Sequence, residues 1–329
     1  MKHKVTKKIS IIAILLLFSF YGVSQRAFQR SFQRISQPTF DFVRAEAELV
    51  ELFTEVVRGE THQIRYNANL RFLELLKSTL AEEGAFDYPF ADLHTEILMP
   101  PDRKFRLFNW MVRRESRGMD FFAVMMVRNE QTNTFRIIQL IDDGDAIFDL
   151  PNTVLNKNSW FGARYYQLIQ TEHNGRRYYT LLGANANDRI VNRRVIEVMT
   201  FRPNGDPVFG ADVFTGVGGR RERIRRKIFE FRHGRTMILR YDFQAYHEPI
   251  GGPPPRPGQP PRVRLVHTNM IVFDRLMPPN ADLRGRREVY IAAGGVYDAF
   301  VWKDGRWTLK LDIRARNPAP PRQRWWRRG

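Results

Sequence analysis

The chain of 329 residues contains no cysteine. Disulfides, thiolate metal ligands, cysteine nucleophiles and a lipid-modified cysteine are therefore excluded. The fold must be held together by its hydrophobic core, and a chain of this length is long enough to bury a large one, in one domain or two.

Acidic residues are also in short supply. Asp and Glu together number 35 against 53 Lys and Arg, which gives a formal net charge of +18. A basic balance of this size favours contact with anionic partners, although charge alone does not identify them.

Long hydrophobic runs are missing after the first few residues. Residues 11–20 are apolar apart from Ser19, and four lysines precede them without any acidic residue. This run is about half of the roughly 20 residues that a membrane-spanning helix needs. With Gly22 and Ser24 at the −3 and −1 positions, residues 1–24 are predicted to be a cleavable signal peptide. The alternative is an uncleaved N-terminal anchor.

Export sets the expected compartment and partners. Cleavage would lower the net charge from +18 to +14, because it removes Lys2, Lys4, Lys7 and Lys8. The mature chain is expected in the periplasm, on the outer membrane or outside the cell. There its partners would be anionic lipid, acidic polysaccharide or an acidic protein, and not nucleic acid. No membrane span is predicted after cleavage, and the oligomeric state is left open.

Helical periodicity is confined to the N-terminal part. Residues 25–38 repeat a short basic unit and are interpreted as a flexible lead-in. Residues 39–84 are predicted to form an αα-hairpin, because apolar residues recur at steps of three and four on both sides of Gly59. Thr61 is expected to cap the second helix and Gly84 to end it.

From residue 102 to 313 the pattern changes to alternating apolar and polar residues with frequent aromatic and β-branched side chains. Hairpin turns are predicted at Gln131–Asn133, Asn174–Gly175, Asn204–Gly205, His233–Gly234 and Asp304–Gly305. The fold class is therefore mainly β, an antiparallel meander arranged as a sandwich, a barrel or a propeller-like ring. A proline-rich loop at 249–262 and a basic, disordered tail at 314–329 complete the prediction.

Motifs for catalysis are scarce. The chain has no His-Glu-x-x-His pair, no Gly-x-Ser-x-Gly elbow and no complete phosphate-binding loop. No cofactor is predicted. Carboxylate pairs for glycoside hydrolysis stay open, because the fold and not the sequence spacing sets their separation.

An acidic cluster at Asp142, Asp143 and Asp145 is the candidate metal site. Several carboxylates on one flexible loop suit a hard cation such as Ca²⁺. The favoured interpretation is nevertheless a solvated turn, since Asp and Gly are also common turn formers.

A basic segment follows the glycines at 216–219. It could hold a polyanion through six cations, and the favoured alternative is a charged strand edge that discourages edge-to-edge pairing. The six are Arg220, Arg221, Arg223, Arg225, Arg226 and Lys227.

The C-terminal tail mixes cations with indoles at Trp325, Trp326, Arg327 and Arg328. This combination suits a headgroup or carbohydrate interface. A basic tail without a binding role explains it equally well.

Several separated motifs of the β-region resemble an uncharacterised family of exported proteins of Gram-negative bacteria. They are found in order within residues 105–317, and they include Val195–Phe201, Gly205–Gly210, Ile271–Pro278 and Val296–Phe300. The resemblance implies export and a β-fold, and it brings no activity, ligand or catalytic residue.

Two functions follow as expectations. The first is a non-enzymatic binding or structural module for an anionic envelope component or a protein partner. The second is a hydrolase of envelope glycans that uses carboxylates assembled by the fold.

Overall fold

The computed structural model describes residues 40–115, 118–186, 190–251 and 259–313, and the described residues from Val43 onward belong to one compact unit. Helices α2 (Phe42–Arg58) and α3 (His62–Ala81) come first. Thr61 caps α3 as predicted, because its hydroxyl accepts a hydrogen bond from the Ile64 N–H. The helix ends at Ala81 and not at Gly84, since Glu82 already has an extended backbone.

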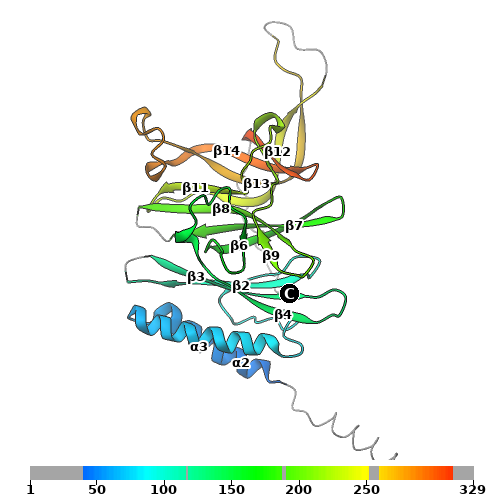
Figure 1. Ribbon diagram of the computed structural model, residues 1–329. Helices are drawn as coiled ribbons and strands as arrows, with labels where there is room; N and C mark the ends of the chain where they lie inside the picture. The colour runs from blue at the N-terminus through cyan, green and yellow to red at the C-terminus, as the bar shows by residue number, and fades with distance from the viewer. Residues whose placement is uncertain (1–39, 116–117, 187–189, 252–258, 314–329) are drawn as a thin grey trace, which may run out of the picture. The chain divides into compact units, whose positions relative to one another are not determined.

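Strands follow the helices and form three open sheets (Figure 1), so the mainly β prediction with two preceding helices is confirmed. The N-terminal sheet is a simple antiparallel meander in the order β1-β2-β3-β4. Its strands are β1 (Glu96–Leu98), β2 (Phe105–Arg113), β3 (Met119–Arg128) and β4 (Phe135–Leu140). Trp110 of β2 packs edge-on against Phe72 of α3 and donates a hydrogen bond to Asn69, so the helices cover one face of this sheet.

The middle sheet is built around β8, which has β7 along one edge. Along the other edge, β11 pairs with residues 191–197 of β8 and β9 with residues 199–201, so the two strands lie end to end. The strands are β5 (Leu155–Asn156), β6 (Arg164–His173), β7 (Arg176–Asn185), β8 (Val191–Phe201), β9 (Pro207–Phe209) and β11 (Arg226–Arg232).

The C-terminal sheet has the order β10-β15-β14-β13-β12. All its pairs are antiparallel except β10 with β15. Its strands are β10 (Phe214–Thr215), β12 (Leu239–Pro249), β13 (Val263–Met277), β14 (Ile291–Lys303) and β15 (Arg306–Ile313). Within the described ranges, four short 3₁₀ turns lie between strands: η1 (Gly144–Ala146), η2 (Val217–Gly219), η3 (Ala281–Leu283) and η4 (Arg287–Val289).

The middle sheet is buried on both faces because its strands carry apolar side chains at consecutive positions. Leu181 of β7 joins a core with β2 and β3, whereas its neighbour Leu182 joins a second core with β13 and β15. Since successive side chains of a strand point to opposite faces, the middle sheet lies between the other two sheets. Trp307 of β15 donates a hydrogen bond to Thr180 of β7 across the second core.

Four of the predicted hairpins are confirmed. Asn174 and Gly175 have φ of 49° and 72°, and Asp304 and Gly305 have 49° and 75°, as a tight primed turn requires. β3 pairs with β4 around residues 131–133, and β8 pairs with β9 around Asn204–Gly205.

The hairpin predicted at His233–Gly234 is wrong. β11 before this turn belongs to the middle sheet, whereas β12 after it pairs with β13 of the C-terminal sheet. Gly234 does have the positive φ of a turn residue, 76°. The chain therefore turns locally as expected, but it passes from one sheet to another, which tertiary packing decides.

The proline-rich loop is described only at its ends, where the Ile250 N–H donates to Arg262 O next to β12 and β13. The predicted signal peptide, lead-in and basic tail lie outside the described residues. Within the described ranges no helix has the length and apolar character needed to cross a membrane.

Candidate functional site

A cleft of about 850 Å³ opens beside the middle sheet. Its wall comes from the loop after β4, from β8, from the segment leading into β11 and from η4. Two regions that the sequence suggested separately meet here: Asp142 and Asp145 of the acidic cluster, and Arg223, Arg226 and Lys227 of the basic segment. The fold thus joins two weak candidates into one site.

Arg226 is the most deeply buried cation of the cleft. Its Nε donates to Glu197 Oε2 at 2.8 Å, and both side chains are 0% exposed. Nη1 donates to the carbonyl oxygens of Leu150 and Thr153, so the side chain ties the loop before β5 to β8. A buried charge needs such partners because it has lost its hydration.

The Arg226–Glu197 pair is only partly satisfied within the described structure. Nη2 of Arg226 and Oε1 of Glu197 are buried and have no hydrogen-bond partner there. Burial raises the pKa of Glu197, and the neighbouring Arg226 opposes this rise. The pair therefore anchors the cleft wall at a considerable cost in desolvation.

Most of the predicted polyanion-binding cations are already engaged. Arg221 pairs with Asp212, Lys227 with Glu222, and Arg225 donates to Gly210 O at 3.1 Å. Arg220 directly follows the 3₁₀ turn η2. It is exposed and does not line the cleft. The six residues consequently do not form one cationic face, and Arg226 is unavailable to a ligand at the surface.

Two guanidinium groups of the cleft are different. Arg223 and Arg287 are exposed, line the cleft and have no ion pair or hydrogen bond through their side chains within the described residues. Arg193, which also lines the cleft, pairs with Glu230 at 3.0 Å. Arg223 was suggested by the sequence, whereas Arg193 and Arg287 were not. Both are distant from the basic segment along the sequence, although the fold brings them to the same cleft.

The apolar part of the cleft includes Ile147, Phe148, Ile224 and Ile228. Phe148 is unusual because it is 105% exposed relative to a reference side chain. Together with the three isoleucines, it gives the cleft an apolar side next to its charged groups.

Asp142 is fixed by backbone groups and not by a cation. Its Oδ1 accepts hydrogen bonds from the N–H groups of Gly144 and Gly162, at 3.1 Å and 3.0 Å. Burial nevertheless raises the pKa of its carboxyl group. A Cβ atom at position 162 would lie 2.2 Å from Asp142 Oδ2, so the site requires glycine there.

The acidic cluster does not converge on a common point. Asp143 accepts a hydrogen bond from the Ser159 hydroxyl at 3.2 Å, away from the backbone groups that hold Asp142. Across the described ranges, no group of three His, Cys, Asp or Glu side chains is placed to hold a metal ion. The described side chains of this cluster are thus held separately, Asp142 by backbone N–H groups and Asp143 by Ser159.

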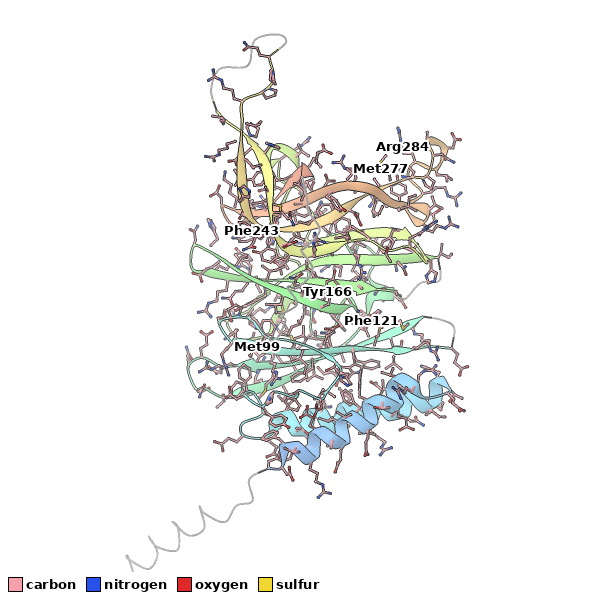
Figure 2. All side chains as sticks on the ribbon, turned by 180° about the vertical axis from the view of Figure 1, so that it is seen from behind. Met99, Phe121, Tyr166, Phe243, Met277 and Arg284 are labelled. Carbon is pink, nitrogen blue, oxygen red and sulfur yellow. The ribbon has the colours of Figure 1, made fainter. Side chains whose placement is uncertain are left out.

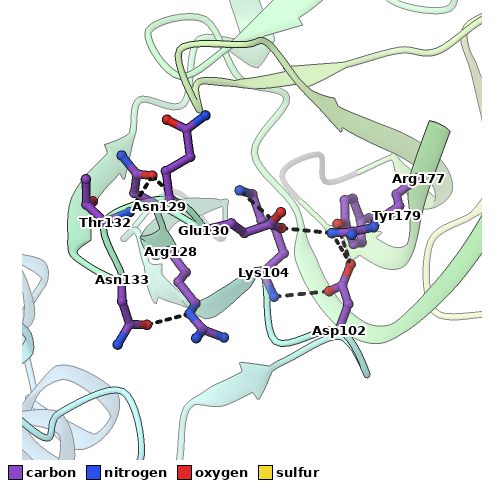
Figure 3. A network of polar contacts seen from close by, with 10 residues as sticks. Asp102, Lys104, Arg128, Asn129, Glu130, Thr132, Asn133, Arg177 and Tyr179 are labelled. Atoms are coloured by element: carbon purple, nitrogen blue, oxygen red, sulfur yellow. Dashed lines mark hydrogen bonds and ion pairs between the residues drawn. The ribbon is translucent and has the colours of Figure 1, made fainter. Parts of the chain in front are cut away.

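A second polar network lies elsewhere, between the N-terminal and middle sheets (Figure 3). Tyr179 of β7 donates to Asp102 Oδ2 at 2.8 Å, and Arg177 pairs with Asp102 and with Glu130. Lys104 adds a contact to Glu130 at 3.5 Å. Burial, followed by the hydrogen bond to Asp102, raises the pKa of Tyr179. The network connects the β3–β4 turn to β7, and no motif in the sequence indicated it.

The interface tail predicted at Trp325, Trp326, Arg327 and Arg328 lies outside the described residues. Comparisons of the chain with models of protein families, with curated proteins and with solved structures find no match. The cleft is therefore interpreted from its own residues.

Proposed function

We propose that the protein is an exported, non-enzymatic binding module whose cleft takes an anionic amphiphile of the bacterial envelope. The observation that carries this proposal is the pair of unengaged guanidinium groups, Arg223 and Arg287, in a cleft that also exposes Phe148. Guanidinium groups bind phosphate and carboxylate oxygens in bidentate geometry. An exposed aromatic and aliphatic wall suits an acyl chain.

The remaining charges support a selective site and not a general polyanion trap. Lys227 and Arg193 are held by Glu222 and Glu230, so they do not add free positive charge. Asp145 brings a carboxylate to the same wall. A long polyanion would meet this negative charge, whereas a small headgroup can contact Arg223 and Arg287 alone.

Binding to vesicles that contain phosphatidylglycerol tests the headgroup contact. The double variant Arg223→Gln/Arg287→Gln is expected to bind about tenfold more weakly, a loss of about 1.4 kcal/mol. The control Arg71→Gln/Arg202→Gln removes two exposed arginines that do not line the cleft, and it should bind like the wild type. Equal losses in both variants would reduce the effect to net charge and contradict the proposed site.

Phe148→Ser tests the apolar contact. Vesicle binding should fall, because the exposed ring no longer contacts acyl chains. Retention on heparin, which we expect to be weak and salt-sensitive in the wild type, should be unchanged. If heparin binds as tightly as the vesicles and Phe148→Ser affects neither, the ligand is an acidic polysaccharide and not an amphiphile.

Export is a separate part of the proposal and has its own test. It rests on the lysines and the apolar run of residues 1–24 and on the resemblance to exported proteins. N-terminal sequencing of the protein from an envelope fraction should begin at Gln25. A chain that begins at Met1 would support an uncleaved anchor.

A glycan hydrolase is the second candidate, favoured by one observation. Asp142 lies in the cleft with a raised pKa, as a general acid requires. Release of reducing ends from purified peptidoglycan, abolished by Asp142→Asn, would establish this activity. Equal release by the variant would exclude Asp142 as the acid.

A further inference from the structure

β12 is an edge strand of the C-terminal sheet. The hydrogen bonds at its two ends show which of its residues bond to β13 and which point away from the sheet. Asp274 N–H donates to Ile238 O, and Ile250 N–H donates to Arg262 O. Both pairs continue the uninterrupted register of β12 with β13, and hydrogen-bonded positions alternate along an antiparallel ladder. The even-numbered residues of β12 therefore bond to β13. The odd-numbered residues therefore direct their N–H and C=O groups away from the sheet.

The first part of this edge is covered by side chains of β6. Tyr166 OH donates to Leu239 O at 2.8 Å. Gln167 Oε1 accepts from Tyr241 N–H at 2.9 Å, and its Nε2 donates to Tyr241 O at 3.4 Å. The backbone groups of Leu239 and Tyr241 are thus protected from pairing with another strand.

The next part of the edge is open. Ala245 and His247 direct their backbone groups outward, and no described residue bonds to them. Phe243 N–H is held only by the carboxylate of the adjacent Asp242. Pro249 has no N–H and closes the window at its other end. Three alternate positions, Phe243, Ala245 and His247, therefore form an open window centred on Ala245.

An apolar strip follows the same window. The paired segments 243–249 of β12 and 263–269 of β13 are called the β12–β13 arm. Paired residues of an antiparallel ladder share a face, so Phe243, Val263 and Leu265 lie on one side of this arm. They are 61%, 45% and 53% exposed. Figure 2 shows Phe243 on this arm, beyond Tyr166 of the middle sheet. The face continues from Ile271 and Phe273, which are buried in the core.

We propose that this window pairs with the same window of a second copy of the chain, in an antiparallel, two-fold symmetric contact. Centring the pair on Ala245 places Phe243 opposite His247 of the second copy and Ala245 opposite itself. Ala245 and His247 then find partners directly, and Phe243 does so by exchanging the Asp242 carboxylate for a backbone carbonyl of the second copy. The covered Tyr241 and the proline at 249 limit the pairing at both ends. A two-fold contact requires such a self-complementary surface.

On the opposite face of the arm this register brings two carboxylates together, and nearby cations offset their repulsion. Asp242 comes opposite Glu248 of the second copy, and Glu248 already contacts Arg264 and Lys303 of its own chain. Asp242 contacts Arg240 in the same way. The two carboxylates therefore meet among three cations, and the exposed Arg264 can interact with both.

Single cysteines test the register, because the natural chain has none. In the proposed pair the two Ala245 Cα atoms lie about 5.5 Å apart, within the range of about 4.4–6.8 Å for a disulfide. Ala245→Cys should form a covalent dimer on mild oxidation. His247→Cys is the matched control on the same exposed edge, since its two copies lie about 14 Å apart. Equal cross-linking at both positions would overturn the register.

Two single proline variants test whether the free edge of β12 forms the contact. The measurement is sedimentation velocity over a range of concentrations. The wild type should show a monomer–dimer equilibrium, and Ala245→Pro should be monomeric at an unchanged thermal midpoint, since its N–H points outward. Gln244→Pro should lower the midpoint, because residue 244 bonds to β13. A monomeric wild type, or a dimeric Ala245→Pro, would overturn the proposal. The cleft plays no part in this contact, so its variants leave the dimer intact.

Discussion

Two polar networks link distant parts of this chain, and they differ mainly in their access to water. At the cleft, Arg226 and Glu197 are both 0% exposed, and each is fixed by its surroundings. Between the N-terminal and middle sheets, Arg177 and Glu130 are 40% and 49% exposed. The same pairing of guanidinium and carboxylate therefore has a different energetic meaning in each place.

The difference follows from desolvation. A buried charge that loses its partner has neither water nor a counter-ion, whereas an exposed charge is rehydrated at once. The buried pair should consequently be intolerant of single changes but tolerant of joint replacement. The exposed Arg177–Glu130 pair should be tolerant of both.

Removing Arg226 alone should have the largest effect. Arg226→Met leaves Glu197 buried without a counter-ion, and we expect a loss of about 3–5 kcal/mol in the free energy of unfolding. The measurement is urea unfolding followed by circular dichroism.

The double variant Arg226→Met/Glu197→Leu sharpens this result. It removes both charges and should recover most of the loss, since apolar replacements of a buried pair are often neutral. A double variant that is no more stable than Arg226→Met would show that the lost contacts to Leu150 and Thr153 account for the effect, and not the unpaired charge of Glu197.

Gly162→Ala should have the next largest effect. The new Cβ would approach Asp142 Oδ2 to 2.2 Å, and the strain of such overpacking is about 1–3 kcal/mol. Gly294→Ala is the control, because a Cβ there meets nothing within 4 Å. Similar losses of thermal stability in both variants would mean that the Asp142 carboxylate is not tightly packed against residue 162.

The pH dependence of stability should depend on Asp142. Its pKa in the fold is raised above the ordinary 3.8, so the unfolded chain loses this proton first as the pH rises. The contribution of Asp142 to native stability should therefore fall between pH 3.8 and the raised pKa, then level off. Asp142→Asn cannot titrate, so the stability of this variant relative to the wild type should rise with pH through that window. A constant difference from pH 3 to pH 8 would contradict the raised pKa.

Glu130→Gln should have the smallest effect. It weakens the contacts with Arg177 and Lys104 in an exposed network, and we expect a loss of about 0.2–1 kcal/mol that shrinks at high salt. A loss comparable to that of Arg226→Met would abolish the distinction between the two networks.

Local features of the fold were readable from the sequence. Thr61 capped α3, and Asn174–Gly175 and Asp304–Gly305 formed their hairpins, because each depends on a few neighbouring residues. The turn at Gly234 was also local, but which sheet receives β12 depends on packing. Neighbouring residues predict a turn, but packing in the core determines which sheet the following strand joins.

The cleft could be predicted only in pieces. The basic segment and the acidic cluster were both visible as sequence motifs, and the structure brings parts of each to one wall. Arg193 and Arg287 gave no signal, because each is an ordinary arginine until the fold places it there. Conversely, Arg226 looked like a surface cation but is buried against Glu197.

The division of the β8 edge between β9 and β11 has a consequence for proteolysis. The connection between these strands runs to β15 and back, and its exposed turn contains Val217, Gly218 and Gly219. A protease that cuts this turn would produce two fragments. Each would keep its own strand on β8, β9 in the first and β11 in the second. The nicked chain should therefore remain assembled, and the two fragments, produced separately, should associate into the native fold.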